Sequence, residues 1–171
     1  YSYQASDGEY KGIDVELAKE AFRRLGYRPK FENIVWEDKD ELLADGTVDC
    51  LWSSYSMNGR EDKYQWAGPY LYSRQMVVVK NESEIQTLSD LKGKRIAVQA
   101  TTKAEDLFLH NIKSDLPQMQ QVNCFSTTNE IYAALRKSYV DAIAGHEAML
   151  GSLVKEGKDA YRMLDESIYK S

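Results

Sequence analysis

Apolar residues near the start of the chain recur every three or four positions, which is the spacing of an amphipathic helix. The helix is predicted to begin at Asp14, as its cap, and to stop at Gly26. Its apolar positions are Leu17, Ala18, Ala21, Phe22 and Leu25. Residues 30–35 and 48–53 are then predicted to be strands, separated by a short helix that stops at Gly46.

The same alternation continues to the end of the chain. Further strands are predicted over residues 72–79, 95–99, 122–125 and 140–144. Helical segments are predicted at residues 88–93, from Thr102 to Pro117, after a capping box formed by Thr127 and Glu130, and between the last strand and Gly157. Strands that alternate with helices of these lengths favour βαβ crossovers and largely parallel sheets.

Two short segments of the chain are similar to each other. Residues 43–49 read Leu-Ala-Asp-Gly-Thr-Val-Asp, and residues 135–141 read Leu-Arg-Lys-Ser-Tyr-Val-Asp. Each combines the end of a predicted helix, a tight turn and the start of a predicted buried strand. We interpret the similarity as two related α/β lobes, with residues 77–83 crossing between them; a chance match is the alternative.

Composition and charge exclude several classes of protein. The 171 residues include 22 Lys and Arg against 27 Asp and Glu, a net charge of −5 with no basic cluster, so nucleic-acid binding is not expected. The longest apolar run, residues 76–79, is far shorter than the ~20 residues that span a bilayer. No signal peptide is visible, which is expected of either a cytosolic chain or a trimmed mature segment.

Cysteine and histidine are scarce. The two cysteines, Cys50 and Cys124, lie in apolar, strand-like contexts, and we interpret both as buried small hydrophobic residues, with a disulfide as the alternative. The two histidines, His110 and His146, cannot assemble a zinc site with these cysteines at the usual ligand spacing. No metal site is therefore expected, and no cofactor is expected either.

Motifs of enzymes are nearly absent, but the segment after residue 53 carries binding chemistry. Neither a glycine-rich nucleotide loop nor a nucleophile elbow is present, so no catalytic residue is predicted. Ser54 and Ser56 follow a predicted strand, and Arg60 comes soon after. A guanidinium matches a carboxylate with two parallel hydrogen bonds, so Arg60 is a candidate carboxylate ligand. The alternative is a solvated salt bridge from Arg60 to a neighbouring acid, Glu61 or Asp62.

Three further candidates lie where other predicted elements begin or end. Thr101 and Thr102 link a strand to a helix, where free backbone N–H groups favour an anion; a plain Thr helix cap is the simpler interpretation and is compatible with this one. Glu147, beside His146, could pair with an ammonium group or simply stabilise the start of a helix. Trp36 is either a stacking surface for a ligand or an ordinary core aromatic.

The order and spacing of several short motifs resemble the family 3 extracellular solute-binding proteins, the polar amino-acid receptors of ABC importers. The matching landmarks are residues 8, 12–18, 25–26, 46–49, 60, 68–70, 90–95, 101–102 and 140–142. The resemblance implies a two-lobed α/β fold of the type II periplasmic-binding-protein class, each lobe a mostly parallel sheet flanked by helices. The implied first lobe is residues 1–80, the second is 81–168, and 169–171 begin the return crossing.

The resemblance also implies roles for residues in capturing a small molecule. Arg60 would hold the ligand α-carboxylate, with Ser54 and Ser56 nearby and Trp36 stacking on the ligand side chain. The contact from the second lobe would come from Thr102.

Three features depart from the family pattern. Thr101 stands beside Thr102, but Ala100 replaces the usual glycine before them. His146 occupies the position of the acid that pairs with the ligand ammonium, so Glu147 could substitute, or the ligand could lack that group. The loop before Arg60 is one residue shorter than usual.

The implied function is capture of an amino acid or related carboxylate between hinged lobes, read by the membrane permease of an ABC importer. The implied location is extracytoplasmic, in the periplasm or at the bacterial cell surface with a membrane anchor. The alternative is the ectodomain of a sensor fused to a histidine kinase or cyclic-dinucleotide enzyme; a dehydratase-like enzyme is a third. By the resemblance, the first strand of the first lobe would precede Tyr1, and the segment that returns to complete that lobe would follow Ser171. Exchange of segments between copies could then form an oligomer.

Overall fold

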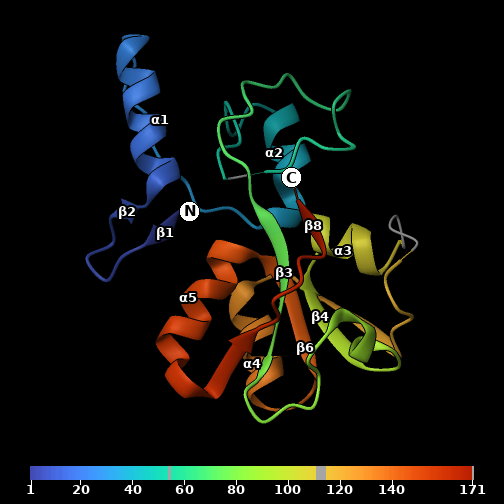
Figure 1. Cartoon of the computed structure of the whole chain (residues 1–171). Helices are drawn as coiled ribbons and strands as arrows, with labels where there is room; N and C mark the ends of the chain where they lie inside the picture. The colour runs from blue at the N-terminus through green and yellow to red at the C-terminus, as the bar shows by residue number, and fades with distance from the viewer. Residues whose placement is uncertain (54, 111–114, 171) are drawn as a thin grey trace. The chain divides into compact units, whose positions relative to one another are not determined.

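The computed structural model describes residues 1–53, 55–110 and 115–170 (Figure 1). Contacts divide the chain into two compact units, Tyr1–Met57 and Asn58–Ser171, which we call the N-terminal and C-terminal units. The predicted lobe boundary after residue 80 differs from this division. Residues 74–80 form a strand that pairs with three others of the C-terminal unit, and so they cluster with it. The lobes of the complete fold stay a prediction.

The C-terminal unit is built on a six-stranded sheet. Its strands are β3 (Arg74–Lys80), β4 (Arg95–Gln99), β5 (Gln121–Phe125), β6 (Ala142–His146), β7 (Tyr161–Met163) and β8 (Tyr169–Lys170). The order is β5-β4-β6-β3-β7, and β8 also pairs with β3. Strand β4 is parallel to β5 and β6, whereas β3 is antiparallel to β6, β7 and β8. The predicted mostly parallel sheet is therefore a mixed one, because β3 enters without a helical crossover.

Helices cover both faces of this sheet (Figure 1). They are η2 (Leu88–Leu91), α3 (Lys103–Phe108), α4 (Thr128–Arg136) and α5 (Glu147–Gly157), and the short η3 (Lys158–Ala160) follows α5. Val77 and Val79 pack towards α3 and η2, while Met76 and Val78 pack towards α4 and α5. Alternate residues of a strand face opposite sides, so the continuous apolar run at 76–79 follows from burial of the sheet on both faces.

Local signals for the helices of this unit are largely confirmed. The capping box of α4 is present: the Glu130 N–H donates to Thr127 Oγ1 at 3.3 Å, and the Thr127 N–H donates to Glu130 Oε2 at 2.9 Å. The helix predicted from Thr102 to Pro117 is α3, which ends at Phe108. Part of the remaining prediction, residues 111–114, lies outside the described residues.

The N-terminal unit contains less regular structure. Its elements are β1 (Tyr3–Gln4), β2 (Tyr10–Lys11), α1 (Ile13–Arg24), η1 (Trp36–Asp38) and α2 (Lys39–Ala44). Helix α1 begins after Gly12, so Asp14 is a buried residue of its first turn and not its cap. Gly12 has φ +119, and a Cβ there would lie 2.0 Å from the Tyr1 carbonyl oxygen. Glycine is therefore required where the helix begins.

Two predicted strands of this unit do not form. Residues 30–35 and 48–53 have no strand assignment, although both are described. A strand exists only when a neighbour satisfies its backbone N–H and C=O groups. Within residues 1–53 and 55–57 the hydrogen-bonded pairing of strands is that of β1 with β2.

The internal similarity corresponds to two equivalent turns. Helix α2 ends before Gly46, with φ +79, and α4 ends before Ser138, with φ +58. The Val48 N–H donates to the Leu42 carbonyl at 3.0 Å, and the equivalent distance from Val140 N to Ala134 O is 3.5 Å. Only the second turn leads into a strand, β6.

The predicted burial of the cysteines is wrong. Both Cys50 and Cys124 are exposed and free. Cys50 belongs to residues 48–53, which form no buried strand. Cys124 lies in β5, which is at the edge of the sheet, so one side of that strand remains open to solvent.

Candidate functional site

The carboxyl ends of β4 and β6 position two of the predicted pairs of site residues. Strand β4 is followed by Thr101 and Thr102, and β6 ends at His146, which is followed by Glu147. The two strands are parallel neighbours, so their carboxyl ends meet at the same edge of the sheet. This edge is where open α/β sheets bind ligands. The structure therefore brings these four residues to one edge of the C-terminal unit.

Arg60 is held against helix α3. Its Nη2 lies 2.6 Å from Asp106 Oδ2, and its side chain is 12 % exposed against 30 % for that of Asp106. This partner lies 46 residues further along the chain. Arg60 is thus a largely buried cation with an internal carboxylate already bound to it.

A second set of contacts anchors the loop that carries Arg60. Lys103 is buried, its Nζ donates to the Asn58 carbonyl at 3.2 Å, and it lies 5.0 Å from the centre of the Tyr169 ring. The Asn58 side-chain amide donates to the Tyr169 hydroxyl at 3.2 Å. The Trp66 indole N–H donates to the Arg60 carbonyl at 3.1 Å. Helix α3 and strand β8 therefore fix the backbone beside Arg60.

The Thr101-Thr102 corner has an unusual backbone. Thr101 has φ +57, a left-handed conformation that is uncommon for a β-branched residue. Its N–H donates to Glu105 Oε2 at 2.7 Å. Thr102 occupies the N-cap position of α3, but its hydroxyl donates back to the Gln99 carbonyl at 2.6 Å and does not cap the helix. Thr102 therefore holds the N-cap position without a side-chain cap, and backbone strain of the kind seen at Thr101 often accompanies function.

His146 is paired across the sheet with a buried amide. Gln75 lies opposite it in the β3–β6 register and is only 1 % exposed. The Gln75 Nε2 is 3.2 Å from His146 Nδ1, and Ser73 Oγ is 3.4 Å from the same nitrogen. The imidazole is therefore oriented by groups of β3 and of the residue just before it.

Glu147 is engaged by a second arginine. Arg74 Nε donates to Glu147 Oε2 at 2.9 Å, and Arg74 Nη2 donates to the other carboxylate oxygen. The hydrogen bonds from Arg74 lower the pKa of Glu147, and the same contact raises the pKa of Arg74. Glu147 is thus a charged carboxylate whose charge is already balanced, which weakens its case as the acceptor of a ligand ammonium.

The remaining predicted residues belong to the N-terminal unit. The Trp36 ring meets the Tyr55 ring edge to face at 5.1 Å, and Lys39 Nζ lies 5.2 Å from the Trp36 ring centre. Ser56 is 8 % exposed. Ser54 lies outside the described residues. Trp36 is therefore part of a packed aromatic group within its own unit.

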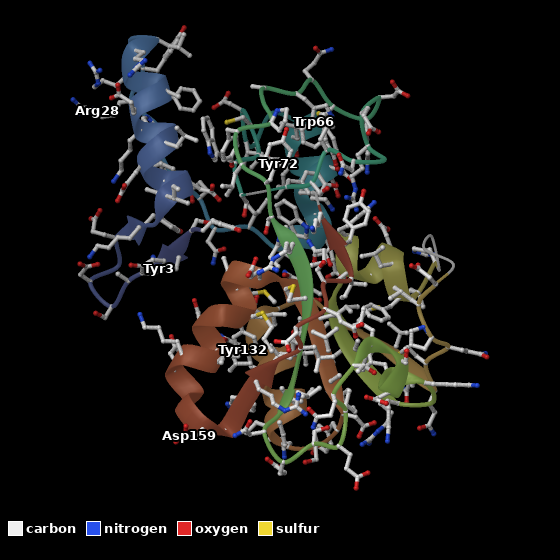
Figure 2. The ribbon with its side chains drawn as sticks, viewed as in Figure 1. Tyr3, Arg28, Trp66, Tyr72, Tyr132 and Asp159 are labelled. Carbon is white, nitrogen blue, oxygen red and sulfur yellow. The ribbon has the colours of Figure 1, made fainter. Side chains whose placement is uncertain are left out.

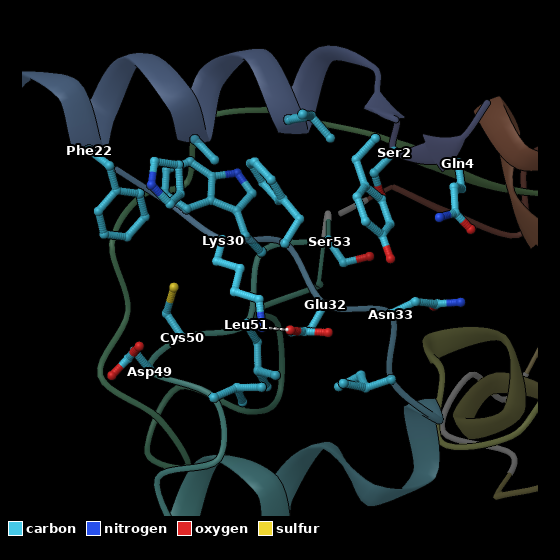
Figure 3. A pocket seen from close by; sticks show the side chains of 18 of the residues that line it. Ser2, Gln4, Phe22, Lys30, Glu32, Asn33, Asp49, Cys50, Leu51 and Ser53 are labelled. Atoms are coloured by element: carbon cyan, nitrogen blue, oxygen red, sulfur yellow. Dashed lines mark ion pairs between the residues drawn. The ribbon is translucent and has the colours of Figure 1, made fainter. Parts of the chain in front are cut away.

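A cavity of about 800 Å³ also lies within the N-terminal unit (Figure 3). Helix α1 contributes Val15, Ala18 and Phe22 to its lining, and the segments at 27–34 and 47–53 contribute most of the rest. Of the predicted site residues, Trp36 is among those that line it. Within the described ranges, no group of three or more His, Cys, Asp and Glu side chains is arranged to hold a metal ion.

Four residues at these positions were missed by reasoning from the sequence: Lys103, Asp106, Arg74 and Gln75. Asp106 follows Thr102 by four positions, which is one helical turn, so the helical spacing alone could have suggested it. Arg74 and Gln75 reach Glu147 and His146 only through the antiparallel register of β3 and β6. Nothing in the sequence specifies that register.

Comparison with known proteins agrees with this architecture. Residues 1–166 match the family model of the bacterial extracellular solute-binding proteins, family 3. The chain therefore belongs to this family, which confirms the resemblance. The family and the relatives that match are solute-binding proteins, not enzymes.

Individual relatives bind different amino acids according to their names. The L-cystine-binding protein TcyJ of Escherichia coli K12 is 28 % identical over 170 residues, which cover 98 % of this chain and 62 % of the relative. A glutamine-binding protein of Geobacillus stearothermophilus is 25 % identical, covering 95 % and 62 %. The chain thus spans less than two thirds of the length of these relatives.

Solved structures show the same fold. The crystal structure of Tv2483 bound to L-arginine has a TM-score of 0.87 and 28 % identity, covering 99 % of this chain and 69 % of the other. An ancestral arginine-binding protein bound to glutamine has a TM-score of 0.85 and 24 % identity, covering 97 % of this chain and 73 % of the other.

None of the helices in the described ranges has the length and apolar character that crossing a bilayer requires.

Proposed function

We propose that this chain is the ligand-binding part of a receptor that captures an amino acid for an ABC importer. The membership of the family and the names of its relatives, which bind cystine, glutamate, glutamine or arginine, support the class of ligand. The partner we propose is the membrane permease of the importer, and the location is extracytoplasmic, with the receptor anchored to the membrane.

The observation that carries the proposal is the largely buried guanidinium of Arg60. An arginine presents a planar fork of donors that fits the two oxygens of an α-carboxylate. Burial strengthens such a contact because water competes less for both groups. Lys103 of helix α3 holds the loop backbone at Asn58, two residues before Arg60, before any ligand arrives. Such pre-organisation lowers the entropic cost of binding.

We assign supporting roles to the other predicted residues. Thr101 and Thr102 add polar contacts to the carboxylate, and Ser54 and Ser56 lie close to Arg60 in sequence and extend this group. His146 faces the rest of the ligand, in place of a carboxylate, with Glu147 held by Arg74. Trp36 provides an apolar surface for the ligand side chain.

Titration calorimetry with a panel of amino acids tests this function. The protein is expected to bind at least one of L-cystine, L-glutamine, L-glutamate and L-arginine. Replacing Arg60 with Ala should weaken that binding by about 100-fold or more, because a charge-assisted contact is lost. Arg60→Lys keeps the charge but not the fork and should be intermediate. Arg136→Ala removes the same charge from an exposed position on α4 and should leave the affinity unchanged.

Two results would contradict the proposal. Retention of wild-type affinity in both Arg60 variants would remove Arg60 from the site. Failure of the wild-type protein to bind any amino acid would remove the proposed function. Circular dichroism of each variant without ligand checks that a loss of binding is not a loss of the fold.

A further inference from the structure

Arg60 carries an acidic partner that belongs to the protein itself. The distance of 2.6 Å between Arg60 Nη2 and Asp106 Oδ2 is that of a strong, charge-assisted hydrogen bond. An aspartate side chain ends in the same group as the α-carboxylate of an amino acid. Asp106 therefore makes with the Arg60 guanidinium the same kind of contact that the carboxylate of a ligand would make.

The surrounding contacts hold the two residues together. Lys103 lies on the same helix as Asp106 and binds the Asn58 carbonyl, two residues before Arg60. The loop and the helix are thus joined independently of the ion pair. The adjacent acid, Glu105, has a different task, because its carboxylate accepts the Thr101 N–H at 2.7 Å. Helix α3 thus directs one carboxylate to the Thr101 corner and the other to Arg60.

We propose that Asp106 is an internal competitor for the ligand carboxylate and that it sets the affinity and charge preference of the site. The proposal rests on the proposed function, in which Arg60 receives the carboxylate. A ligand has to displace Asp106 from Nη2 or share the guanidinium with it. The displaced carboxylate can be solvated, since the Asp106 side chain is 30 % exposed.

A charge preference follows from the position of Asp106. After displacement its negative charge remains beside the ligand on the same helix. A second carboxylate on the ligand is repelled by it, whereas a cationic side chain is attracted. The site should therefore disfavour acidic amino acids relative to neutral ones of the same shape. Glutamate and glutamine form such a pair.

Asp106→Asn tests the proposal, because Asn has nearly the same shape and lacks the charge. The probes are L-cystine, L-glutamine, L-glutamate and L-arginine, measured by titration calorimetry. We expect the dissociation constant of each ligand that binds to fall, by about tenfold for a neutral amino acid. The gain should be largest for glutamate and smallest for arginine. Thermal unfolding without ligand reports whether the variant is folded.

Asp159→Asn is the matched control. It removes the same charge from an exposed residue of η3 (Figure 2). This short helix follows the C-terminal end of α5, whereas His146 directly precedes the N-terminal end of α5. Its dissociation constants should equal those of the wild type. Equal gains in both variants would show a general effect of net charge and overturn the proposal.

Other results separate this proposal from the function on which it rests. If Arg60→Ala abolishes binding while Asp106→Asn leaves it unchanged or weakens it, the function stands and Asp106 is not a competitor. If binding persists in Arg60→Ala, Arg60 is not the carboxylate ligand and the competition by Asp106 fails, while the capture of an amino acid stands. If only the Asp106→Asn protein binds a probe, the competition is stronger than proposed and the function is supported. If neither the wild-type protein nor the variant binds any probe, both are overturned.

Discussion

The two units of this protein have similar patterns of apolar residues but form different secondary structure from them. Both contain amphipathic helices and apolar segments at similar spacing. In the C-terminal unit these segments become strands of a mixed sheet covered on both faces. In the N-terminal unit they remain without strand pairing. Of the buried apolar side chains in the described ranges, Val15 and Ala18 alone belong to the N-terminal unit.

Helix α1 shows what this difference means. Its apolar spacing is sound, yet Leu17 is 37 % exposed and Leu25, just after the helix, is 68 % exposed. Phe22 packs on the Trp52 ring at 6.0 Å, and Ala18 and Phe22 line the cavity. Periodicity thus predicts that a helix forms and which face is apolar. Whether that face is buried depends on a sheet that other segments must build.

Truncation of a core leucine should produce the largest contrast between the units. Leu135→Ala in α4 removes a fully buried side chain and should cost about 2–5 kcal/mol of the free energy of unfolding. Leu25→Ala in the N-terminal unit should stay within about 0.5 kcal/mol, because the side chain is mostly in water. Urea unfolding followed by circular dichroism measures both. A large loss of the free energy of unfolding in Leu25→Ala would contradict this prediction, because it would show that the Leu25 side chain belongs to a core despite its exposure.

Each unit contains a carboxylate whose pKa is lowered, and the two carboxylates should differ in how much they stabilise the fold against low pH. Hydrogen bonds from Arg95 lower the pKa of Asp141 in the C-terminal unit, where the side chain is 30 % exposed. Because the folded pKa lies below the unfolded one, this contact stabilises the fold above about pH 4 and is lost as the pH falls further. Asp141→Asn should therefore cost about 1 kcal/mol at pH 7, after allowance for solvent screening, and less below pH 4.

Glu20 in the N-terminal unit is the comparison for that experiment. Arg23 and Arg24 lower its pKa to about 2, but the group is fully exposed. Solvent and salt screen such a pair, so Glu20→Gln should change the pH dependence of unfolding less than Asp141→Asn does. Thermal unfolding of both variants and of the wild type between about pH 2.5 and 7, which spans the ordinary carboxylate pKa values, measures the two pH dependences. Equal pH dependence in the two variants would contradict the prediction.

The two equivalent turns give a small effect and the closest match between the units. Gly46 and Ser138 both have positive φ, which a residue with a Cβ adopts at a cost. Gly46→Ala should destabilise by about 1 kcal/mol, and Ser138→Gly should stabilise by a few tenths, the gain being offset by loss of the Lys80 contact to the Ser138 hydroxyl. Stabilisation by Gly46→Ala would show that the turns are not equivalent in solution.

Local patterns predicted much of the C-terminal unit. Strand β4 was expected over the residues that it occupies, and the capping box of α4 was read from Thr127 and Glu130. The strand ends that carry Thr101 and His146 were expected as well. The sequence could not show that Cys124 lies on an edge strand or that β3 runs antiparallel to β6. Both depend on the order of strands, which is set by contacts between distant segments.

The sequence by itself determined which segments form most of the helices, which residues are apolar on each element, and which side chains carry carboxylate-binding chemistry. These features depend on neighbours in the chain, through hydrogen bonds and side-chain spacing of a few residues. Only the tertiary structure decided that Arg60 is bound by Asp106 and that Arg74 neutralises Glu147. Such ion pairs join residues far apart in sequence, so they exist only once the sheet and helix α3 have brought them together.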